Sequence, residues 1–417
     1  MPQKSSTHPN RDVRMRGFAS RSTVEQALAW LEPHERPLEA ETVPLADAAD
    51  RVLAQRVESG VDVPQFRRAM MDGFALLATD TQGATTYNRL MLRVVGEAWP
   101  GRPFDGKVEP GTAVRIMTGA PMPEGANAVL PVEQVEIEGD QVALLGEVPP
   151  EKHVGRIGED IARDSEVLPA GRRLRPQDLG VLSSVAVARV PVVRRPRVRI
   201  VVTGNEILPA GSTPGPYQIV DANGPMLESL IERDGGVPIY PGIVPDDKQA
   251  IASALEDDCD VVLVSGGSSV GQEDYVPVLL ADRGELAIHG IAMRPSSPAG
   301  MGTLAKRIVF LLPGNPVSCL CAYDFFAGRV IRALGGRLTD WPYQRRRLPL
   351  ASKLVSTVGR VDYARVLIND SEEVEPLAIS GASILSSTTR ATGFVIIPGD
   401  SEGSPPGAEV DVYLYDQ

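Results

Sequence analysis

The sequence has few of the residues that build disulfide frameworks and zinc sites. Its 417 residues include three cysteines and four histidines, and neither set has zinc-ligand spacing. This scarcity excludes a disulfide-stapled secreted domain and is consistent with a reducing cytosol. Cys319 and Cys321 lie in an apolar run, and we interpret them as helix core rather than as a redox centre.

Long apolar runs and an excess of positive charge are also absent. The longest apolar runs, such as residues 308–312, are far shorter than the ~20 residues that span a bilayer. A formal net charge of −12 gives no positive field that would gather nucleic acid. The first 20 residues carry basic side chains with no apolar stretch after them, which favours a solvated tail over a signal peptide. We therefore expect a cytoplasmic protein without membrane or nucleic-acid partners.

The length of the chain and the even spread of 40 glycines and 36 prolines favour several globular domains. A capping box at 22–25 predicts a helix that ends near Leu31, and a second helix is expected at 45–58. The expected parts are a flexible tail (1–20), a linking helical region in two pieces (21–61 and 160–190), a β-rich insertion domain (62–159), an α/β domain (191–337) and a C-terminal β-barrel (338–417).

After a proline-containing linker expected at 190–196, strand and helix patterns alternate. Each crossover between parallel strands needs an intervening helix, so this alternation predicts a doubly wound α/β fold. The predicted strands are residues 197–203, 237–243, 260–265, 286–293 and 307–312, and the predicted helices are residues 225–233, 247–257, 275–282 and 317–334.

Three loops that follow predicted strands are rich in glycine. In an open parallel sheet, ligands bind beyond the carboxyl ends of the strands, where glycines let backbone N–H groups approach anionic oxygens. A single loop of this kind is more often an ordinary turn, but three that converge on one edge predict a phosphate site. The loop residues are Thr203, Gly204 and Glu206, then Ser265, Gly266 and Gly267, then Pro313, Gly314, Asn315 and Ser318.

Acidic side chains lie beside these loops. Glu206 is in the first loop, Asp274 follows the second, and Asp246 and Asp247 follow the strand expected at 237–243. Carboxylates near a phosphate site indicate Mg²⁺, which bridges carboxylate and phosphate oxygens, and Glu206 and Asp246 are the expected ligands. The alternative is that one of the pair at 246–247 caps the helix that starts near Lys248.

Two segments of the N-terminal half are unusual. Asp72 stands beside a glycine in an otherwise apolar stretch, and residues 117–127, which include Thr118 and Gly119, form a long turn-rich loop. As structure alone, both segments are bends in a β domain. The residues by themselves therefore support a phosphate-binding α/β domain with a β-rich companion.

Six strings, in this order and spacing, resemble the molybdopterin molybdenumtransferases, the family of bacterial MoeA and the E-domain of gephyrin-like proteins. The resemblance extends over nearly the whole chain. It implies a homodimer of four-part protomers, each with a MogA-like molybdopterin-binding α/β domain whose cleft is completed by the β-rich insertion of the other subunit. The strings are MDGFA at 71–75, MTGAPMPEG at 117–125, GEDI at 158–161, TGNE at 203–206, SGG at 265–267 with VG at 270–271 and DY at 274–275, and PGNPVS at 313–318.

The resemblance also implies a reaction. Adenylylated molybdopterin is cleaved with Mg²⁺ while molybdate is joined to its dithiolene, and AMP and molybdenum cofactor are released for other assembly proteins or apo-molybdoenzymes. By motif position, Asp72, Asp160, Glu206 and Asp246 inherit catalytic roles. Substrate-binding roles pass to Thr118, Gly119, Arg156, Thr203, Gly204, Ser265, Gly266, Gly267, Asp274, Arg294, Pro313, Gly314, Asn315, Ser318 and Arg365.

The sequence departs from the family's pattern at three places. Arg294 and Ser297 stand where the family has two lysines, Arg156 alone remains of a run of arginines, and Ala382 replaces a serine. Arg and Lys differ in how they hold a compact oxyanion. One hypothesis is an enzyme with a rearranged oxyanion site; the others are a paralogous molybdopterin-binding scaffold or adaptor and an enzyme for a different phosphorylated small molecule. The rearranged site would use Arg294, Ser297, Arg365 and Ser383.

Overall fold

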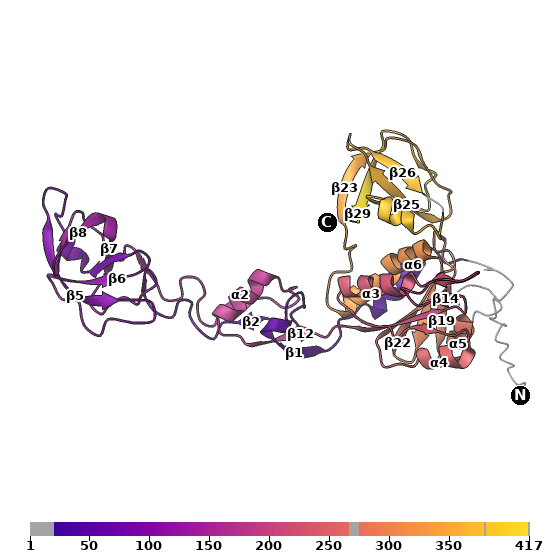
Figure 1. Cartoon of the computed structure of the whole chain (residues 1–417), viewed down its shortest axis with the longest axis horizontal. Coiled ribbons are helices and arrows are strands. Elements are labelled where there is room, and N and C mark those ends of the chain that lie inside the picture. The colour runs from indigo at the N-terminus through magenta and orange to yellow at the C-terminus, as the bar shows by residue number, and fades with distance from the viewer. Residues whose placement is uncertain (1–20, 267–274, 379–380, 416–417) are drawn as a thin grey trace, which may run out of the picture. The chain divides into compact units, whose positions relative to one another are not determined.

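The computed structural model of the chain describes residues 21–266, 275–378 and 381–415. They form two compact units (Figure 1). Of the described residues, the first unit holds those up to Glu41, Asp50–Ala54 and those from Val192 onward; the second holds Thr42–Ala49 and Gln55–Pro191. The tail expected at 1–20 lies outside the described residues. No helix in the described stretches has both the length and the apolar character of a membrane span.

A seven-stranded sheet forms the centre of the first unit, in the order β16-β13-β18-β22-β21-β19, with β17 also beside β13. The first strands of this order are parallel, and β21 and β19 add an antiparallel edge. Because β13 lies between β16 and β18, the strand order reverses there, which confirms the doubly wound fold. The strands are β13 (Arg197–Thr203), β16 (Val237–Ile239), β17 (Ile243–Val244), β18 (Val261–Ser265), β19 (Glu285–His289), β21 (Gly300–Leu304) and β22 (Arg307–Leu312), and a separate parallel pair is formed by β14 (Ile207–Leu208) and β15 (Ile219–Val220).

Both faces of this sheet are buried. Along β13, Ile200 and Val202 belong to one apolar cluster and Val201 to the other, as strand alternation requires. Cys319 and Cys321 are free thiols in the first cluster, which confirms the interpretation as helix core. That cluster packs beneath α1 (Val24–Leu31), α3 (Asn223–Arg233), α6 (Pro316–Ala322), the π-helix η5 (Tyr323–Ala327) and α7 (Gly328–Leu334), and the second beneath α4 (Lys248–Ala254) and α5 (Tyr275–Arg283); the 3-10 helix η1 (Glu32–His34) follows α1.

The rest of the first unit is a β domain, as the sequence predicts for its C-terminal part. Its six-stranded sheet has the order β20-β25-β27-β29-β23, with β26 also beside β25, around a core that includes Val366 and Val412. The elements are β20 (Met293–Arg294), β23 (Gln344–Pro349), β24 (Leu354–Val355), β25 (Val361–Ile368), β26 (Val374–Ala378), α8 (Ser386–Arg390), β27 (Gly393–Ile397), β28 (Gly403–Ser404) and β29 (Glu409–Leu414).

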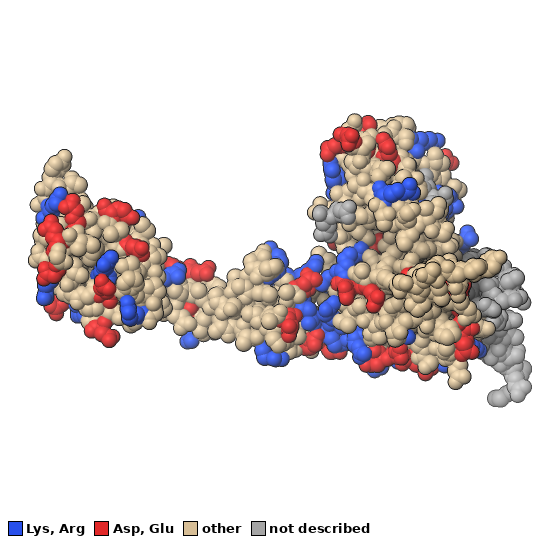
Figure 2. Space-filling view, in the orientation of Figure 1, with Lys and Arg blue, Asp and Glu red and all other residues tan. Residues whose placement is uncertain are grey.

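The second unit contains the predicted β-rich domain, a six-stranded sheet in the order β7-β4-β6-β5-β9-β8. Acidic and basic side chains are mixed over its visible face (Figure 2). Its elements are η2 (Leu45–Asp47), β2 (Val57–Glu58), β3 (Arg68–Ala69), β4 (Gly73–Leu76), η3 (Ala78–Thr81), β5 (Leu90–Ala98), β6 (Thr112–Ile116), β7 (Ala128–Pro131), η4 (Val132–Gln134), β8 (Val135–Glu138), β9 (Gln141–Leu144), β10 (Val154–Gly155), β11 (Glu166–Leu168) and α2 (Pro176–Ser184); β1 (Ala40–Pro44) and β12 (Arg189–Val193) lie where the chain passes between the units.

The linking region differs from the expectations in two details. The helix expected at 45–58 is one 3-10 turn, because Asp50 adopts a φ of 66° and the chain then runs extended. The chain passes from one unit to the other inside the linker expected at 190–196, between Pro191 and Val192, but the start of this segment is strand β12, where Val190 and Val192 are buried. The buried apolar side chains of this segment thus favour a strand in spite of its prolines.

Two predicted strands of the α/β domain are also incorrect in extent. The strand at 237–243 is divided into β16 and β17, since Gly242 adopts a φ of 122°. The strand at 286–293 is divided between two sheets as β19 and β20, and β21 was not predicted. Its Gly302 suits a strand here because a Cβ would lie 1.9 Å from the Glu285 carbonyl oxygen.

Candidate functional site

A cavity of about 750 Å³ opens at the carboxyl ends of the parallel strands. β13, β18 and β22 are neighbours in register, with Val202 opposite Ser265 and Ser265 opposite Leu312. The loops after these strands therefore begin at the same position along the strand direction. This confirms the predicted convergence. The sequence-predicted residues that line the cavity are Thr203, Gly204, Glu206, Asp246, Ser265, Gly266, Pro313, Gly314 and Asn315; Gly267 lies outside the described residues.

The glycines of these loops allow backbone to approach backbone. Gly266 has a φ of +94°, and a Cβ there would lie 2.4 Å from the Thr203 carbonyl oxygen. A Cβ on Gly314 would be in ordinary van der Waals contact with the Cα of Gly266, at 3.7 Å, so the second and third loops lie close together. Helix α6, with Pro316 at its first position, begins directly after the third loop, so the positive end of its dipole lies at the same edge.

Several lining residues were not predicted from the sequence. Asn223, the first residue of α3, is 6% exposed and donates from Nδ2 to the Ser265 Oγ and the Gly314 carbonyl oxygen, both at 2.8 Å. Asn223 Oδ1 and Thr203 Oγ1 are buried and have no hydrogen-bond partner within the described part of the chain. The only sequence signal for Asn223 is a polar residue at the start of a helix near the sheet edge. The other unpredicted residues include Ile207, Ile219 and Asp221.

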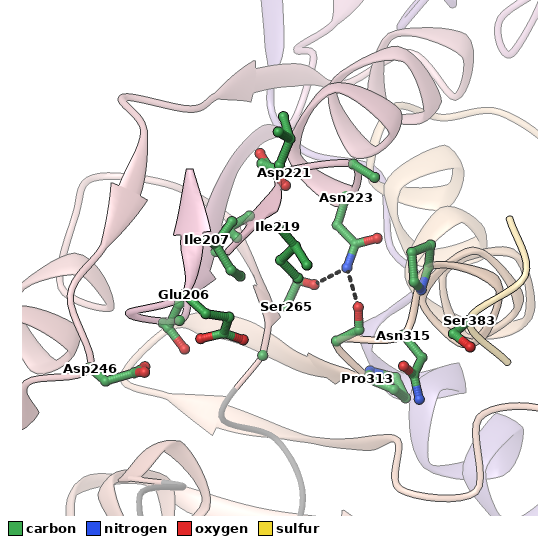
Figure 3. Close-up of a pocket in the computed structure, with 18 of the residues that line it drawn as sticks. Glu206, Ile207, Ile219, Asp221, Asn223, Asp246, Ser265, Pro313, Asn315 and Ser383 are labelled. Carbon is green, nitrogen blue, oxygen red and sulfur yellow. Dashed lines mark hydrogen bonds between the residues drawn. The ribbon is translucent and has the colours of Figure 1, made fainter. Parts of the chain in front are cut away.

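The carboxylates divide into capping groups and cavity-facing groups. Asp247 is the N-cap of α4, accepting from the backbone N–H groups of Gln249 at 3.0 Å and Ala250 at 2.9 Å. Asp246 instead lines the cavity with Glu206, and its Oδ2 accepts from the backbone N–H of Asn205 at 3.1 Å. The capping alternative therefore applies to Asp247 and leaves the predicted metal ligand available. Figure 3 shows Glu206 and Asp246 together on one side of the pocket, across from Asn315 and Ser383.

Asp221 also lines the cavity, but protein groups hold its carboxylate. It accepts from the Gly224 N–H at 2.9 Å and from the Tyr240 hydroxyl at 2.6 Å. Burial raises the pKa of Tyr240, and the hydrogen bond to Asp221 raises it further. Within the described residues, no cluster of three or more His, Cys, Asp and Glu side chains could hold a metal ion. Asp274 lies outside that part of the chain, so its predicted position is not described.

Three predicted binding residues lie outside the lining of the cavity. Arg294 donates to the fully buried carboxylate of Asp362, and Ser318 is a buried residue of α6 whose carbonyl oxygen accepts from the Ser296 hydroxyl. Arg365 is fully buried, and this burial lowers its pKa. Nearby, Pro298 and Ser383 do line the cavity. A hydrogen bond from the Val317 N–H to the Ala382 carbonyl oxygen, 3.0 Å, holds the Ser383 segment against α6.

The other predicted residues lie in the second unit, around the short strand β3. Asp72 accepts from the backbone N–H of Thr118 at 2.7 Å and from its hydroxyl at 2.8 Å. These two bonds, the backbone one first, hold the pKa of Asp72 below its usual value. Asp72 and Thr118, predicted separately, thus form one exposed pair.

Gly119 and Arg156 border the same strand. Gly119 has a φ of 84° and donates its N–H to the Ala69 carbonyl oxygen at 2.8 Å. Arg156 follows β10, which pairs with β3, and its backbone N–H donates to Glu159 Oε2 at 2.8 Å. Asp160 donates its N–H to the Val63 carbonyl oxygen at 3.1 Å. Unlike the residues of the cavity, these side chains are presented on an open surface.

Three family models match the chain in succession. "MoeA N-terminal region (domain I and II)" matches residues 22–186, "Probable molybdopterin binding domain" matches 199–333, and "MoeA C-terminal region (domain IV)" matches 347–415. A molybdopterin molybdenumtransferase from Haemophilus influenzae is 32% identical over 94% of this chain and 98% of its own length. The chain belongs to the MoeA family. The residues that line the cavity lie in the part matched as a molybdopterin-binding domain, except Ser383, which lies in the C-terminal match.

Further MoeA relatives match along nearly their whole length. Molybdopterin molybdenumtransferase 2 of Mycobacterium tuberculosis is 34% identical over 89% of this chain and 94% of its own. The crystal structure of a molybdopterin biosynthesis MoeA protein from Pyrococcus horikosii matches with a TM-score of 0.81 and 32% identity, covering 95% of this chain and 100% of that chain. The family and fold expected from the six strings are therefore confirmed.

Proposed function

We propose that this MoeA-family chain is a molybdopterin molybdenumtransferase, which joins molybdate to the dithiolene of adenylylated molybdopterin and releases AMP. The observation that carries the proposal is the cavity at the sheet edge, where glycine loops after β13, β18 and β22 meet the carboxylates Glu206 and Asp246. Closely approaching backbone N–H groups and the start of α6 suit the phosphate groups of such a substrate. The apolar side chains of Ile207 and Ile219 suit its flat ring.

The donor set of the cavity fits Mg²⁺. This ion is commonly held by one or two carboxylates together with substrate phosphate oxygens and water, and Glu206 and Asp246 are two carboxylates on one wall. When bound, Mg²⁺ would neutralise charge on the phosphate oxygens and polarise the phosphoryl group. The protein's own part is to orient the substrate through the backbone of Gly204, Gly266 and Gly314.

We place the molybdate subsite near Ser383 and Pro298, using Arg294, Ser297 and Arg365 in a rearranged oxyanion site. Pro298 and Ser383 line the cavity, and the Ser297 hydroxyl and Arg294 Nε are buried polar atoms without a hydrogen-bond partner among the described residues. Serine hydroxyls and a guanidinium can replace the donors of two lysines, although with a different geometry. This arrangement would keep metal insertion possible without the family's lysine motif.

The exposed pair Asp72–Thr118, with Gly119, Arg156 and Asp160, would serve the same reaction from a second subunit. The resemblance to the family supports a homodimer in which this surface faces the cavity of the partner. The protein would act in the cytoplasm, in line with its three free cysteines, and pass its product to other assembly proteins or apo-molybdoenzymes.

The second candidate is a scaffold that binds molybdopterin without inserting the metal. It is favoured by Arg294, whose guanidinium pairs with Asp362 instead of lining the cavity. Incubation with adenylylated molybdopterin, Mg²⁺ and molybdate separates the two. Release of AMP with reconstitution of an apo-molybdoenzyme is the expected result, whereas binding without either product would refute the enzyme and favour the scaffold.

A further inference from the structure

One amide side chain connects two of the glycine loops. Asn223 Nδ2 reaches Ser265 Oγ at the end of β18 and the carbonyl oxygen of Gly314 after β22, and both distances are 2.8 Å. Figure 3 shows both bonds meeting at the amide nitrogen, with the amide oxygen turned away from them. A residue of α3 therefore links two loops that belong to different strands.

The chemistry of the neighbours fixes the orientation of this amide. A carbonyl oxygen can only accept, so the NH₂ group and not Oδ1 must face Gly314. Both amide hydrogens are then used, one for each loop. A carboxylate of the same shape could not reproduce this arrangement, because it has no hydrogen to donate and would face the lone pairs of Gly314.

The start of α3 does not depend on the Asn223 side chain. The N-cap of this helix is Ala222, which makes no side-chain cap bond, and Asp221 Oδ1 accepts from the N–H of Gly224 at 2.9 Å. The amide of Asn223 is also nearly inaccessible, at 6% exposure, so it does not offer a broad contact surface to a ligand. Its hydrogen bonds therefore serve the loops and not the helix.

The two loops lie close together, but backbone packing between them leaves some space. A Cβ at Gly314 would be 3.7 Å from the Gly266 Cα, and a Cβ at Gly266 would be 2.4 Å from the Thr203 carbonyl oxygen. Because this space remains, we expect that losing the amide link lets one loop shift relative to the other. The backbone N–H groups of both loops would then no longer converge on one anionic group.

We propose that Asn223 is a positioning residue of the reaction proposed above, which sets the spacing of the Ser265–Gly266 and Pro313–Gly314 loops for the phosphorylated substrate. It acts through the two loops and does not touch the reacting atoms. The role in catalysis rests on the proposed function, whereas the effect on loop spacing belongs to the protein alone. Two measurements therefore test the two parts separately.

The first measurement is hydrogen–deuterium exchange of Asn223→Asp and wild-type protein at one pH near neutrality. Peptides that contain Ser265–Gly266 and Gly314 should exchange faster in the variant, and peptides of the β-rich second unit should not change. The matched control is Asn88→Asp in the second unit, where the wild-type amide donates to the Gly83 carbonyl oxygen at 2.7 Å, so the variant loses the same kind of bond away from the cavity. Its peptides that contain Ser265–Gly266 and Gly314 should exchange as in wild type.

The second measurement compares the KM for adenylylated molybdopterin, followed by AMP release, from about pH 8 to about pH 6. At the upper end Asn223→Asp should raise KM roughly tenfold, as expected for two lost hydrogen bonds. Burial beside a carbonyl oxygen favours the neutral acid, which can donate to Gly314, so the ratio to wild type should fall as pH decreases. Asn88→Asp should keep the wild-type KM across this range.

Other titratable groups surround the amide, namely Asp221 and Tyr240 on its own side, Cys319 in α6, and Glu206 and Asp246 on the cavity wall. Burial raises the pKa of Cys319 to about 12 and also raises that of Tyr240, so neither thiol nor phenol titrates in this window. The carboxylates are present in both proteins, so the ratio of variant to wild type removes their contribution.

Asn223→Ala provides a second route if the aspartate variant does not fold. It removes both bonds without adding charge, and it should raise KM with no dependence of the ratio on pH. Wild-type exchange in both loops, or an unchanged KM in both variants, would overturn the proposal. If wild-type protein releases no AMP, the proposed function fails instead, and the exchange experiment still decides whether Asn223 sets the loops.

Discussion

Replacing Gly266 with alanine tests whether the loop after β18 must stay in backbone contact with β13. Gly266 adopts a φ of +94°, where a side chain is strained whatever space surrounds it. The added Cβ would also lie 2.4 Å from the Thr203 carbonyl oxygen and 3.2 Å from its hydroxyl. Since the nearest atom belongs to backbone, the loop itself has to move.

The expected size of the effect follows from the strain. A non-glycine residue held in a sparsely populated backbone region costs about 1–3 kcal/mol. The loop is at the rim of a cavity, so it can relieve this strain by moving away from Thr203. The backbone N–H groups of the loop are then displaced from the position in which we expect them to bind the substrate. If the same free energy is lost from substrate binding, the KM for adenylylated molybdopterin rises by roughly 5- to 150-fold.

Steady-state AMP release measures this change directly. Gly180→Ala is the matched control, because Gly180 lies in helix α2, a Cβ there would meet nothing within 4 Å, and alanine is the better helix former. That variant should keep the wild-type KM. A wild-type KM in Gly266→Ala would show that the loop does not contact the substrate and would refute the reasoning.

Three other results are expected. Glu206→Ala should reduce AMP release at least about 100-fold at saturating substrate, because a Mg²⁺ ligand is lost; undiminished turnover in this variant would remove the carboxylate from the mechanism. Burial works to raise the pKa of Asp178, but its ion pairs with Arg172 and Arg175 outweigh this and hold the pKa well below 3.8. The contribution of Asp178 to stability is therefore present above about pH 4 and is lost as pH falls through the lowered pKa. Asp178→Asn should lower Tm at pH 7 much more than in strong acid. An equal loss of Tm at both pH values would contradict this. Thr118→Val removes the hydroxyl bond to Asp72 but keeps the backbone bond, so the pKa of Asp72 should rise, which NMR titration of the side-chain carboxyl would detect as a midpoint at higher pH.

The sheet and its loops were predictable because their causes are local. Strands such as β18 are buried on both faces, so they appear in the sequence as continuous apolar runs followed at once by glycine turns. Once these strands were assigned in parallel order, the convergence of Thr203, Ser265 and Pro313 followed from geometry. The antiparallel edge strand β21 was missed because its glycines resemble a turn until the carbonyl groups of β19 are placed beside them.

The remaining features of the site depend on contacts between distant residues. From the sequence, Arg294 is expected to be a cation available to a ligand, but it pairs with Asp362, a residue 68 positions away. From the sequence, Asn223 is expected only to begin a helix. Its hydrogen bonds to Ser265 and Gly314 form only when the three elements pack together. No local pattern predicts such pairs, since each partner is polar for reasons that its own segment does not reveal.

A crystal structure of the protein with adenylylated molybdopterin would test the central claim most directly. The predicted result is a ligand whose phosphate groups accept hydrogen bonds from the backbone N–H groups of the loops at Gly204, Gly266 and Gly314, beside Glu206 and Asp246. Ligand bound elsewhere, for example in the cavity lined by Met226 and Leu230, with the three loops empty, would contradict it.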